Sequence, residues 1–147
     1  MQRLAARVVV VNEEGQTLLL RAGDPARPEA GTWWFTPGGG VEGDETVIEA
    51  ASRELREETG LEVEQPLGPI HRRATTFEFT GETFQQREVY FYIVVPTFEI
   101  DTRGWTVLER AVMRESRWWS LREIETTDET VYPENLAALL MEVFDTH

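Results

Sequence analysis

The sequence predicts an α/β layered fold with a mixed β-sheet, contained in one domain. Strand-like stretches occur before, between and after two helical patterns, as expected when helices pack on a sheet. The chain has 147 residues, which is within the usual size of one domain. No internal repeat, low-complexity tract or long linker divides it, so we expect residues 1–147 to form a single domain.

The first part of the chain predicts a hairpin, a loop and a short strand. The apolar runs 8–11 and 18–20 flank a turn cluster at 12–15, as in a hairpin of buried strands. Two prolines and two glycines mark 22–32 as a surface loop. The aromatic run 33–35 then predicts a short strand that stops at the Pro-Gly-Gly-Gly sequence after it.

A helix is predicted next. Thr46 and Glu49 have the spacing of a capping box, and Gly60 provides a C-terminal stop. Apolar residues recur between them at helical spacing: Val47, Ile48, Ala51 and Leu55. We therefore expect a helix that buries one face.

The rest of the chain predicts more strands and a final helix. Strand-like stretches at 75–79 and 87–95 are joined through a Thr-Gly-Glu turn, whereas the polar stretch 97–115 shows no clear pattern. Residues 117–120 predict a short strand that leads into a turn. The last element, 133–144, is predicted as a helix because it begins with proline and carries apolar residues at helical spacing.

The composition excludes several classes of function. The chain has no cysteine, which removes disulfides, thiolate metal sites and cysteine nucleophiles, and it has no lysine for a Schiff base or a P-loop. A net charge of −13 argues against nucleic acid or an anionic membrane as the main partner. The apolar run 8–11 is too short for a signal segment or a membrane span, so we expect a cytoplasmic protein. A homodimer stays open, because no pattern distinguishes a dimer face from an exposed apolar strand.

The predicted helix concentrates acidic residues. Glu57 and Glu58 follow Glu54 by three and four positions, so the three carboxylates share one side. Like charges at this spacing destabilise a helix by about 0.2–0.5 kcal/mol per pair. Arg53 can pair with Glu57 or Glu49, and a hard divalent cation would turn the remaining repulsion into coordination. Taken alone, the cluster is better explained as the solvated face of a helix in an acidic protein.

The flanking residues give this helix a specific pattern. The segment reads Gly39-x5-Glu45-x7-Arg53-Glu54-Leu55-x-Glu57-Glu58-x-Gly60-Leu61. It resembles the Nudix box, the signature of the Nudix hydrolases, at every fixed position over residues 39–61. Trp34–Gly39 before the box and Trp118–Ile124 near the end resemble the family more loosely. The resemblance implies a Nudix-type α/β/α sandwich with a mixed sheet.

The resemblance also implies a reaction and its cofactor. Water would attack phosphorus and split a nucleoside diphosphate from another group, with Mg²⁺ or Mn²⁺ as the cofactor and a small-molecule nucleotide as the substrate. Glu57 and Glu58 would hold the metal, and Glu54 would be either a third ligand or the base that takes the proton of the water. Arg53 would complete the catalytic set by orienting the helix, with Glu45 as its supporting ion-pair partner.

Further candidates lie outside the helix. Gly38, Gly39 and Gly40 would shape a loop and offer backbone contacts to the substrate. Arg21 would reach a phosphate or cap a strand end, and Trp34 would stack on a base or pack in the core. The family implies one more acidic group, for which Glu109 and Glu115 are well placed, although both are equally ordinary surface residues in a glutamate-rich chain.

Several other side chains have structural explanations. Arg72 and Arg73 are expected at the solvated surface, with phosphate contact as the alternative. His71 and His147 lack partners at metal-ligand spacing, and we expect neither to be catalytic. Trp118-Trp119 is expected to anchor the late strand to the core.

Two substrate classes compete, namely nucleoside triphosphates, including oxidised ones, and dinucleotides or nucleotide sugars. No proline occurs at 75–77, where relatives that act on ADP-ribose tend to carry one, and no tyrosine occurs at 77–79, where relatives that act on diadenosine polyphosphates tend to have one. The substrate therefore stays open. The alternative function is a catalytically silent Nudix-fold module that senses a nucleotide, although such modules usually lose glutamates of the box.

Overall fold

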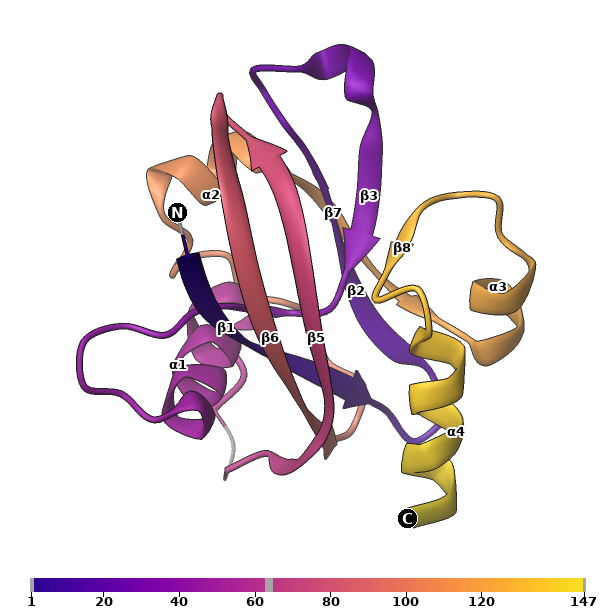
Figure 1. The fold of residues 1–147 in the computed structure, drawn as a ribbon. Coiled ribbons are helices and arrows are strands. Elements are labelled where there is room, and N and C mark those ends of the chain that lie inside the picture. Colours follow the sequence, from indigo (N-terminus) through magenta and orange to yellow (C-terminus); the bar gives the residue numbers. More distant parts are fainter. Residues whose placement is uncertain (1, 63–64, 147) are drawn as a thin grey trace.

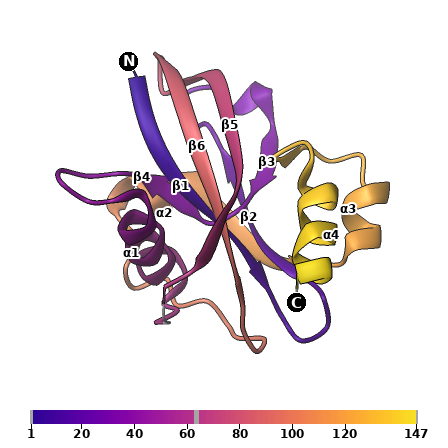
Figure 2. The same ribbon diagram turned by 60° about the horizontal axis from the view of Figure 1, so that its bottom comes forward.

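The computed structural model describes residues 2–62 and 65–146, with the backbone alone for Arg114. One mixed sheet forms the middle layer, with α1 on one face and α3 and α4 on the other (Figures 1 and 2). The strands are β1 (Gln2–Val11), β2 (Thr17–Gly23), β3 (Thr32–Phe35), β4 (Gly38–Gly40), β5 (Leu67–Phe79), β6 (Glu82–Val94), β7 (Met113–Trp119) and β8 (Val131–Tyr132). The helices are α1 (Val47–Thr59), α2 (Val107–Val112), α3 (Leu121–Thr126), α4 (Leu136–Thr146) and the 3-10 turn η1 (Pro28–Ala30). The predicted α/β layered fold is confirmed.

Strand β1 organises the sheet. It pairs in parallel with β6 along its whole length and antiparallel with β4 at Ala5–Arg7. The predicted hairpin of β1 and β2 is present, and its pair Val11↔Thr17 lies next to the turn. Beyond that point β2 pairs with β3 and β7 instead, so the first two strands diverge and the sheet curls.

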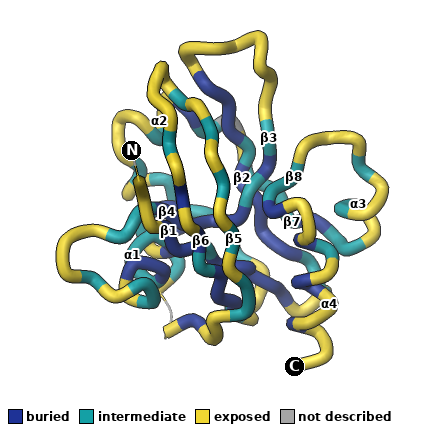
Figure 3. The backbone as a smooth tube through the Cα atoms, in the orientation of Figure 1, coloured by how far each residue is buried: buried dark blue, intermediate teal, exposed yellow. Residues whose placement is uncertain are grey.

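Side chains of β1 alternate between the two faces of the sheet. Val8 and Val10 pack against α1, whereas Val9 and Val11 pack towards α4. The two late tryptophans also divide, since Trp119 lies in the α4 cluster and Trp118 packs against the α1 cluster. Their predicted role as anchors of the late strand is confirmed. The buried residues form the middle of the tube in Figure 3, and exposed residues concentrate in loops and hairpin tips.

Helix α1 has the ends that its sequence predicts. The Thr46 hydroxyl accepts a hydrogen bond from the Glu49 backbone N–H, and the Glu49 carboxylate accepts one from the Thr46 N–H. Gly60 ends the helix in the left-handed conformation with φ of 77°. The buried face carries Ala51 and Leu55, which contact β1.

The structure differs from the sequence-based expectation in several places. Gly38–Gly40 is a strand, because it pairs with β1. β5 starts at Leu67, so the region around Pro66 and Pro69 is not a simple break. β6 runs from Glu82 to Val94 and is longer than predicted. The last helix starts at Leu136 and not at Pro133, because residues 133–135 form its preceding turn, in which the Leu136 N–H donates to the Pro133 carbonyl.

The stretch 97–115 also contains a helix that was not predicted. α2 begins with a second capping box, between Thr106 and Glu109. No helix among the described residues is long and apolar enough to cross a membrane.

Candidate active site

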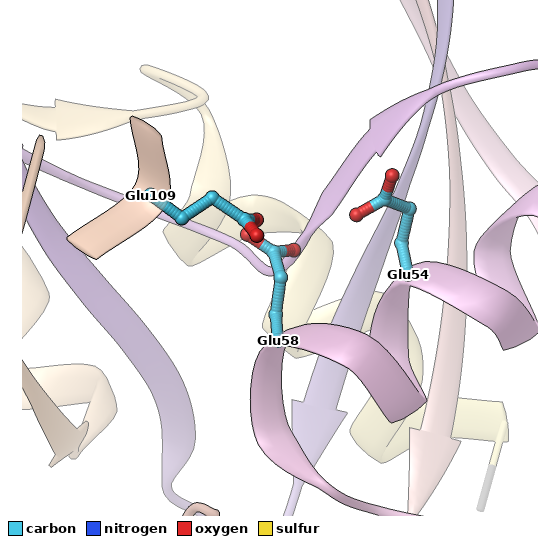
Figure 4. A group of neighbouring side chains, drawn as sticks. All are labelled: Glu54, Glu58 and Glu109. Carbon is cyan, nitrogen blue, oxygen red and sulfur yellow. The ribbon is translucent and has the colours of Figure 1, made fainter. Parts of the chain in front are cut away.

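Three carboxylates meet where α1 faces α2. Oxygen atoms of Glu54, Glu58 and Glu109 all lie within 4.8 Å of one another. Figure 4 shows them pointing towards one another, two from successive turns of α1 and one from α2. Of the two acidic residues considered outside the box, the structure therefore brings Glu109 to the cluster. Glu115 instead forms an ion pair of 2.7 Å with Arg21.

Glu57 lies outside this cluster. Its side chain is 39% exposed, and one carboxylate oxygen accepts a hydrogen bond of 3.1 Å from Arg53. This bond confirms the predicted pairing of Arg53 with Glu57. The assignment of Glu57 as a metal ligand stays a prediction.

The cluster is electrostatically unfavourable without a cation. Burial raises the pKa of Glu58 well above its usual value, and the charge of Glu54 adds to this rise, whereas Arg7 and the Gly38 N–H oppose it. Burial also raises the pKa of Glu54, against the hydrogen bond from Arg53. Buried anions need a counter-charge, and carboxylate oxygens are the donors that Mg²⁺ and Mn²⁺ prefer. The donor set therefore fits the expected divalent cation.

Arg53 connects the helix to the segment before it. Its guanidinium forms two hydrogen bonds with Glu45, of 2.6 and 2.9 Å, and donates to the Gly40 carbonyl. A third nitrogen donates to Glu54 at 2.9 Å. The side-chain hydrogen bonds from Arg53 lower the pKa of Glu45 to about 2. This bidentate pair fixes the position of Arg53, and through it the position of the Glu54 carboxylate.

The three glycines of β4 allow close approach. A Cβ on Gly38 would lie 2.1 Å from the Ala6 carbonyl oxygen, and a Cβ on Gly39 would lie 2.5 Å from the Glu54 carboxyl carbon. The Gly38 N–H donates to Glu58 at 2.6 Å. The glycines thus hold a strand between β1 and the acidic cluster. Their predicted contact with substrate stays a prediction.

The segment before α2 is attached to the end of α1. The indole N–H of Trp105 donates to the Glu58 carbonyl at 2.7 Å, and the Asp101 N–H donates to the Thr59 carbonyl at 2.9 Å. A Cβ on Gly104 would lie 2.7 Å from the Glu57 carbonyl oxygen, so this contact also requires a glycine. These contacts place Glu109 opposite Glu58.

A cavity of about 410 Å³ lies between β1, β3 and the β5–β6 hairpin. Aromatic rings form much of its wall: Trp33, Phe35, Phe77, Phe79, Tyr90 and Tyr132. Trp34 is not part of it, because this ring is 3% exposed and packs edge-on against Trp119 in the core. Strand alternation explains the result, since Trp33 and Phe35 share the face opposite to Trp34. Of the two alternatives for Trp34, the structure shows core packing, and a ring buried in this way offers no free face to a base.

Charged and polar side chains that sequence reasoning missed also line the cavity. Arg7, Gln86 and Glu88 lie there, as does Arg73, which was expected at the surface. Gln86 and Glu88 alternate with Tyr90 on the buried face of β6. Polar residues at apolar-face positions of a predicted strand were the available signal. His71 packs its ring against Tyr90 in the α4 layer, and His147 lies outside the described residues.

Comparisons with known proteins agree with this architecture. A NUDIX domain family model matches residues 1–139. The structure is similar to the MutT protein from Methanosarcina mazei Go1, with 27% identity and a TM-score of 0.63 over 99% of this chain and 94% of that chain. It is also similar to a MutT NUDIX hydrolase from Burkholderia pseudomallei, with 22% identity and a TM-score of 0.66 over 97% of this chain and 98% of that chain.

A curated relative matches over a shorter segment. An RNA pyrophosphohydrolase from Halorhodospira halophila is 47% identical over 55 residues, which cover 37% of this chain and 26% of that protein. The match thus spans about a quarter of the length of this curated relative. Because the family model covers nearly the whole chain, this protein belongs to the Nudix hydrolase family, as its sequence predicts.

Proposed function

We propose that the protein is a divalent-metal-dependent pyrophosphohydrolase that cleaves a diphosphate linkage in a nucleotide. The convergence of Glu54, Glu58 and Glu109 carries the proposal. These carboxylates would hold Mg²⁺ or Mn²⁺, and the half-exposed Glu57 is close enough in sequence to join them as a further ligand. When bound, the cation supplies neutralisation of the diphosphate charge and a lower pKa for a coordinated water.

The chain itself would contribute a proton acceptor and its orientation. Glu54 is either a ligand or the base: as the base, it takes the proton of the attacking water on a carboxylate oxygen. The water oxygen then bonds to phosphorus while the bond from phosphorus to the bridging oxygen breaks. Arg53 touches Glu54 and Glu57 and would keep both carboxylates in place.

The aromatic cavity supports a nucleotide substrate. Its volume of about 410 Å³ is in the range of small-molecule sites, and its rings offer faces for a base. Nucleoside triphosphates, including oxidised ones, and dinucleotides or nucleotide sugars remain the two candidate classes. The name of the curated relative adds RNA as a third candidate substrate, against the expectation that nucleic acid is no partner.

A substrate panel tests the proposal. It includes nucleoside triphosphates, dinucleotides, nucleotide sugars and a 5′-triphosphorylated oligoribonucleotide, each assayed with Mg²⁺ and with Mn²⁺ and scored for monophosphate, pyrophosphate and free phosphate. We expect turnover of at least one member that disappears when EDTA is added. Saturable nucleotide binding without turnover under either metal would instead support the silent sensor.

Variants of the glutamates assign the roles. We expect Glu58→Gln to reduce kcat by about 100-fold or more, since a metal ligand and a buried charge are both lost. Glu142→Gln, on the exposed side of α4, is the matched control and should keep wild-type turnover. Full turnover by Glu57→Gln would remove Glu57 from the ligand set.

Cell fractionation tests the expected cytoplasmic location, and light scattering tests whether the protein forms a homodimer.

A further inference from the structure

The proposed reaction leaves one buried charge cluster without a role. Glu88 on β6 is 4% exposed and accepts four hydrogen bonds. The donors are Arg7 at 3.2 Å, Arg73 at 2.6 Å, the Gln86 amide at 2.8 Å and the Tyr90 hydroxyl at 3.0 Å. Four donors saturate the two carboxylate oxygens, so Glu88 itself has no capacity left for a metal or a substrate.

Arg7 lies between the aromatic cavity and the acidic cluster. It lines the cavity, and its guanidinium stands 5.7 Å from the centre of the Phe35 ring. Its Cδ lies against Gly38, at 2.8 Å from the position of a Cβ there, and the Gly38 N–H binds Glu58. One side chain therefore spans the distance from the ring-lined wall to the backbone that supports the carboxylates.

Unused hydrogen-bonding groups remain at this point of the cavity. Within the described residues, only Nε of Arg7 donates to a protein acceptor, which leaves its two terminal amino groups for a ligand. Gln86 is 3% exposed, and its Oε1 is a buried acceptor without a partner among the same residues. Buried polar atoms are rarely left unpaired in a finished site. A bound molecule that presents both a flat ring and hydrogen-bond acceptors would complete these contacts.

We propose that Arg7 is a substrate-binding residue that donates to acceptor atoms of the nucleotide, and that Glu88 is the positioning residue that holds Arg7 in the cavity wall. The proposal rests on the proposed function for the identity of the ligand as a nucleotide. The acceptor belongs either to the edge of the base or to the phosphate next to the ribose, because both offer oxygen or nitrogen lone pairs to a guanidinium.

The role of Glu88 follows from the behaviour of unpaired arginine. Without the carboxylate, the guanidinium groups of Arg7 and Arg73 would repel each other in a partly buried space. Arg7 would also regain the rotamers of a long side chain, and binding would have to order it again. Loss of Glu88 should therefore weaken substrate binding through Arg7 and leave the chemical step largely intact.

A double-mutant cycle tests this link. The variants are Arg7→Met, Glu88→Gln and the double variant, assayed for KM and kcat on the best substrate of the panel. We expect each single variant to raise KM about tenfold, the effect of a lost charge-assisted hydrogen bond, with kcat within about threefold of wild type. The KM of the double variant should not exceed the higher of the two single-variant KM values, since both changes remove the same contact.

The controls match the charge changes. Arg72→Met removes an exposed arginine from the opposite face of β5, and Glu134→Gln removes an exposed glutamate that forms an ion pair of 3.1 Å with Arg73. Arg72→Met should keep wild-type KM, and Glu134→Gln should change KM less than Glu88→Gln does, because Arg73 keeps its bond to Glu88. Single-variant effects on KM that multiply in the double variant, a loss confined to kcat, or an unchanged KM in Arg7→Met would overturn the proposal.

Two further measurements keep the result independent of folding and of turnover. If Glu88→Gln does not fold, Arg7→Met decides alone, because the ion pair of Glu88 with Arg73 remains in that variant.

Calorimetric titration with GMP, AMP and their nucleosides, in EDTA, measures binding without catalysis. Weaker binding of nucleosides by Arg7→Met assigns the acceptor to the base, and weaker binding of monophosphates alone assigns it to the phosphate. Equal binding by wild type and variant refutes the contact. An absence of turnover by wild type in the panel would refute only the proposed function.

Discussion

Gly38→Ala is expected to be among the most destabilising single changes in the chain, although it adds one methyl group. Gly38 has φ of 149°, a backbone region that is largely restricted to glycine and costs other residues about 1–3 kcal/mol. The new Cβ would also lie 2.1 Å from the Ala6 carbonyl oxygen and 2.8 Å from the Arg7 Cα. Both atoms belong to the backbone of β1, so no side chain can move to make room.

The steric overlap adds to the conformational cost. β4 has to move away from β1, which weakens the pairing of Gly38–Gly40 with Ala5–Arg7 and the bond from the Gly38 N–H to Glu58. At about 0.5–1.5 kcal/mol for each hydrogen bond, two or three lost bonds bring the total to about 2–7 kcal/mol. This is a large share of the about 5–15 kcal/mol that stabilises a typical domain.

Gly43→Ala provides the matched comparison. Gly43 also has positive φ, at 51°, but nothing lies within 4 Å of its added Cβ. Its cost should be the conformational part alone, about 1–2 kcal/mol. Urea unfolding of both variants, followed by tryptophan fluorescence in EDTA, measures the difference. If Gly38→Ala were destabilised no more than Gly43→Ala, the close approach of β4 to β1 would not be the reason for this glycine.

Two further predictions concern the acidic cluster and its support. Because burial raises the pKa of Glu58, its contribution to stability is present below about 4.5, the usual value, and is lost as pH rises through the folded-state pKa. In EDTA, wild type should therefore lose stability relative to Glu58→Gln between pH 5 and pH 8, and a constant difference in urea unfolding would contradict the burial argument. Trp105→Phe removes one of the two hydrogen bonds that hold the segment before Glu109 to α1, so Mn²⁺ binding measured by electron paramagnetic resonance should weaken about fivefold. Trp118→Phe loses a similar indole bond, to the Phe98 carbonyl, and should bind Mn²⁺ like wild type, so equal effects of the two changes would exclude a specific role of Trp105.

The predictable features of the fold are those with local signals. The ends of α1 follow from Thr46, Glu49 and Gly60, which act within one helical turn of their own positions. The same reasoning would have found α2, because Thr106 and Glu109 form an equal capping box. The short length of α2 and the polar sequence around it hid the signal. Glu109 was recognisable as a candidate, but its meeting with Glu58 depends on contacts between distant parts of the chain.

The features that sequence could not predict depend on pairing across the sheet. Three consecutive glycines have poor strand propensity, yet Gly38–Gly40 forms β4 because β1 supplies its hydrogen bonds. The direction of Trp34 depends on which face of β3 meets the core, and alternation alone allows either answer. Arg7 and Glu88 come together because β1 and β6 run in parallel, which is a long-range choice of topology.

The same pairing explains how the acidic cluster and the cavity are connected. Arg7 is paired in register with Tyr90 across β1 and β6, and with Gly38 across β1 and β4. A single position of β1 thus lies between the strand that carries Glu88 and the strand that supports Glu58. Two features around Arg7 oppose folding. One is the repulsion within the acidic cluster, and the other is the backbone of β4, which only glycine tolerates. Such local conflicts are common where a protein binds or reacts, because a bound cation and substrate relieve them. The region around Arg7 is therefore the part of the molecule where stability and binding should respond together to a single substitution.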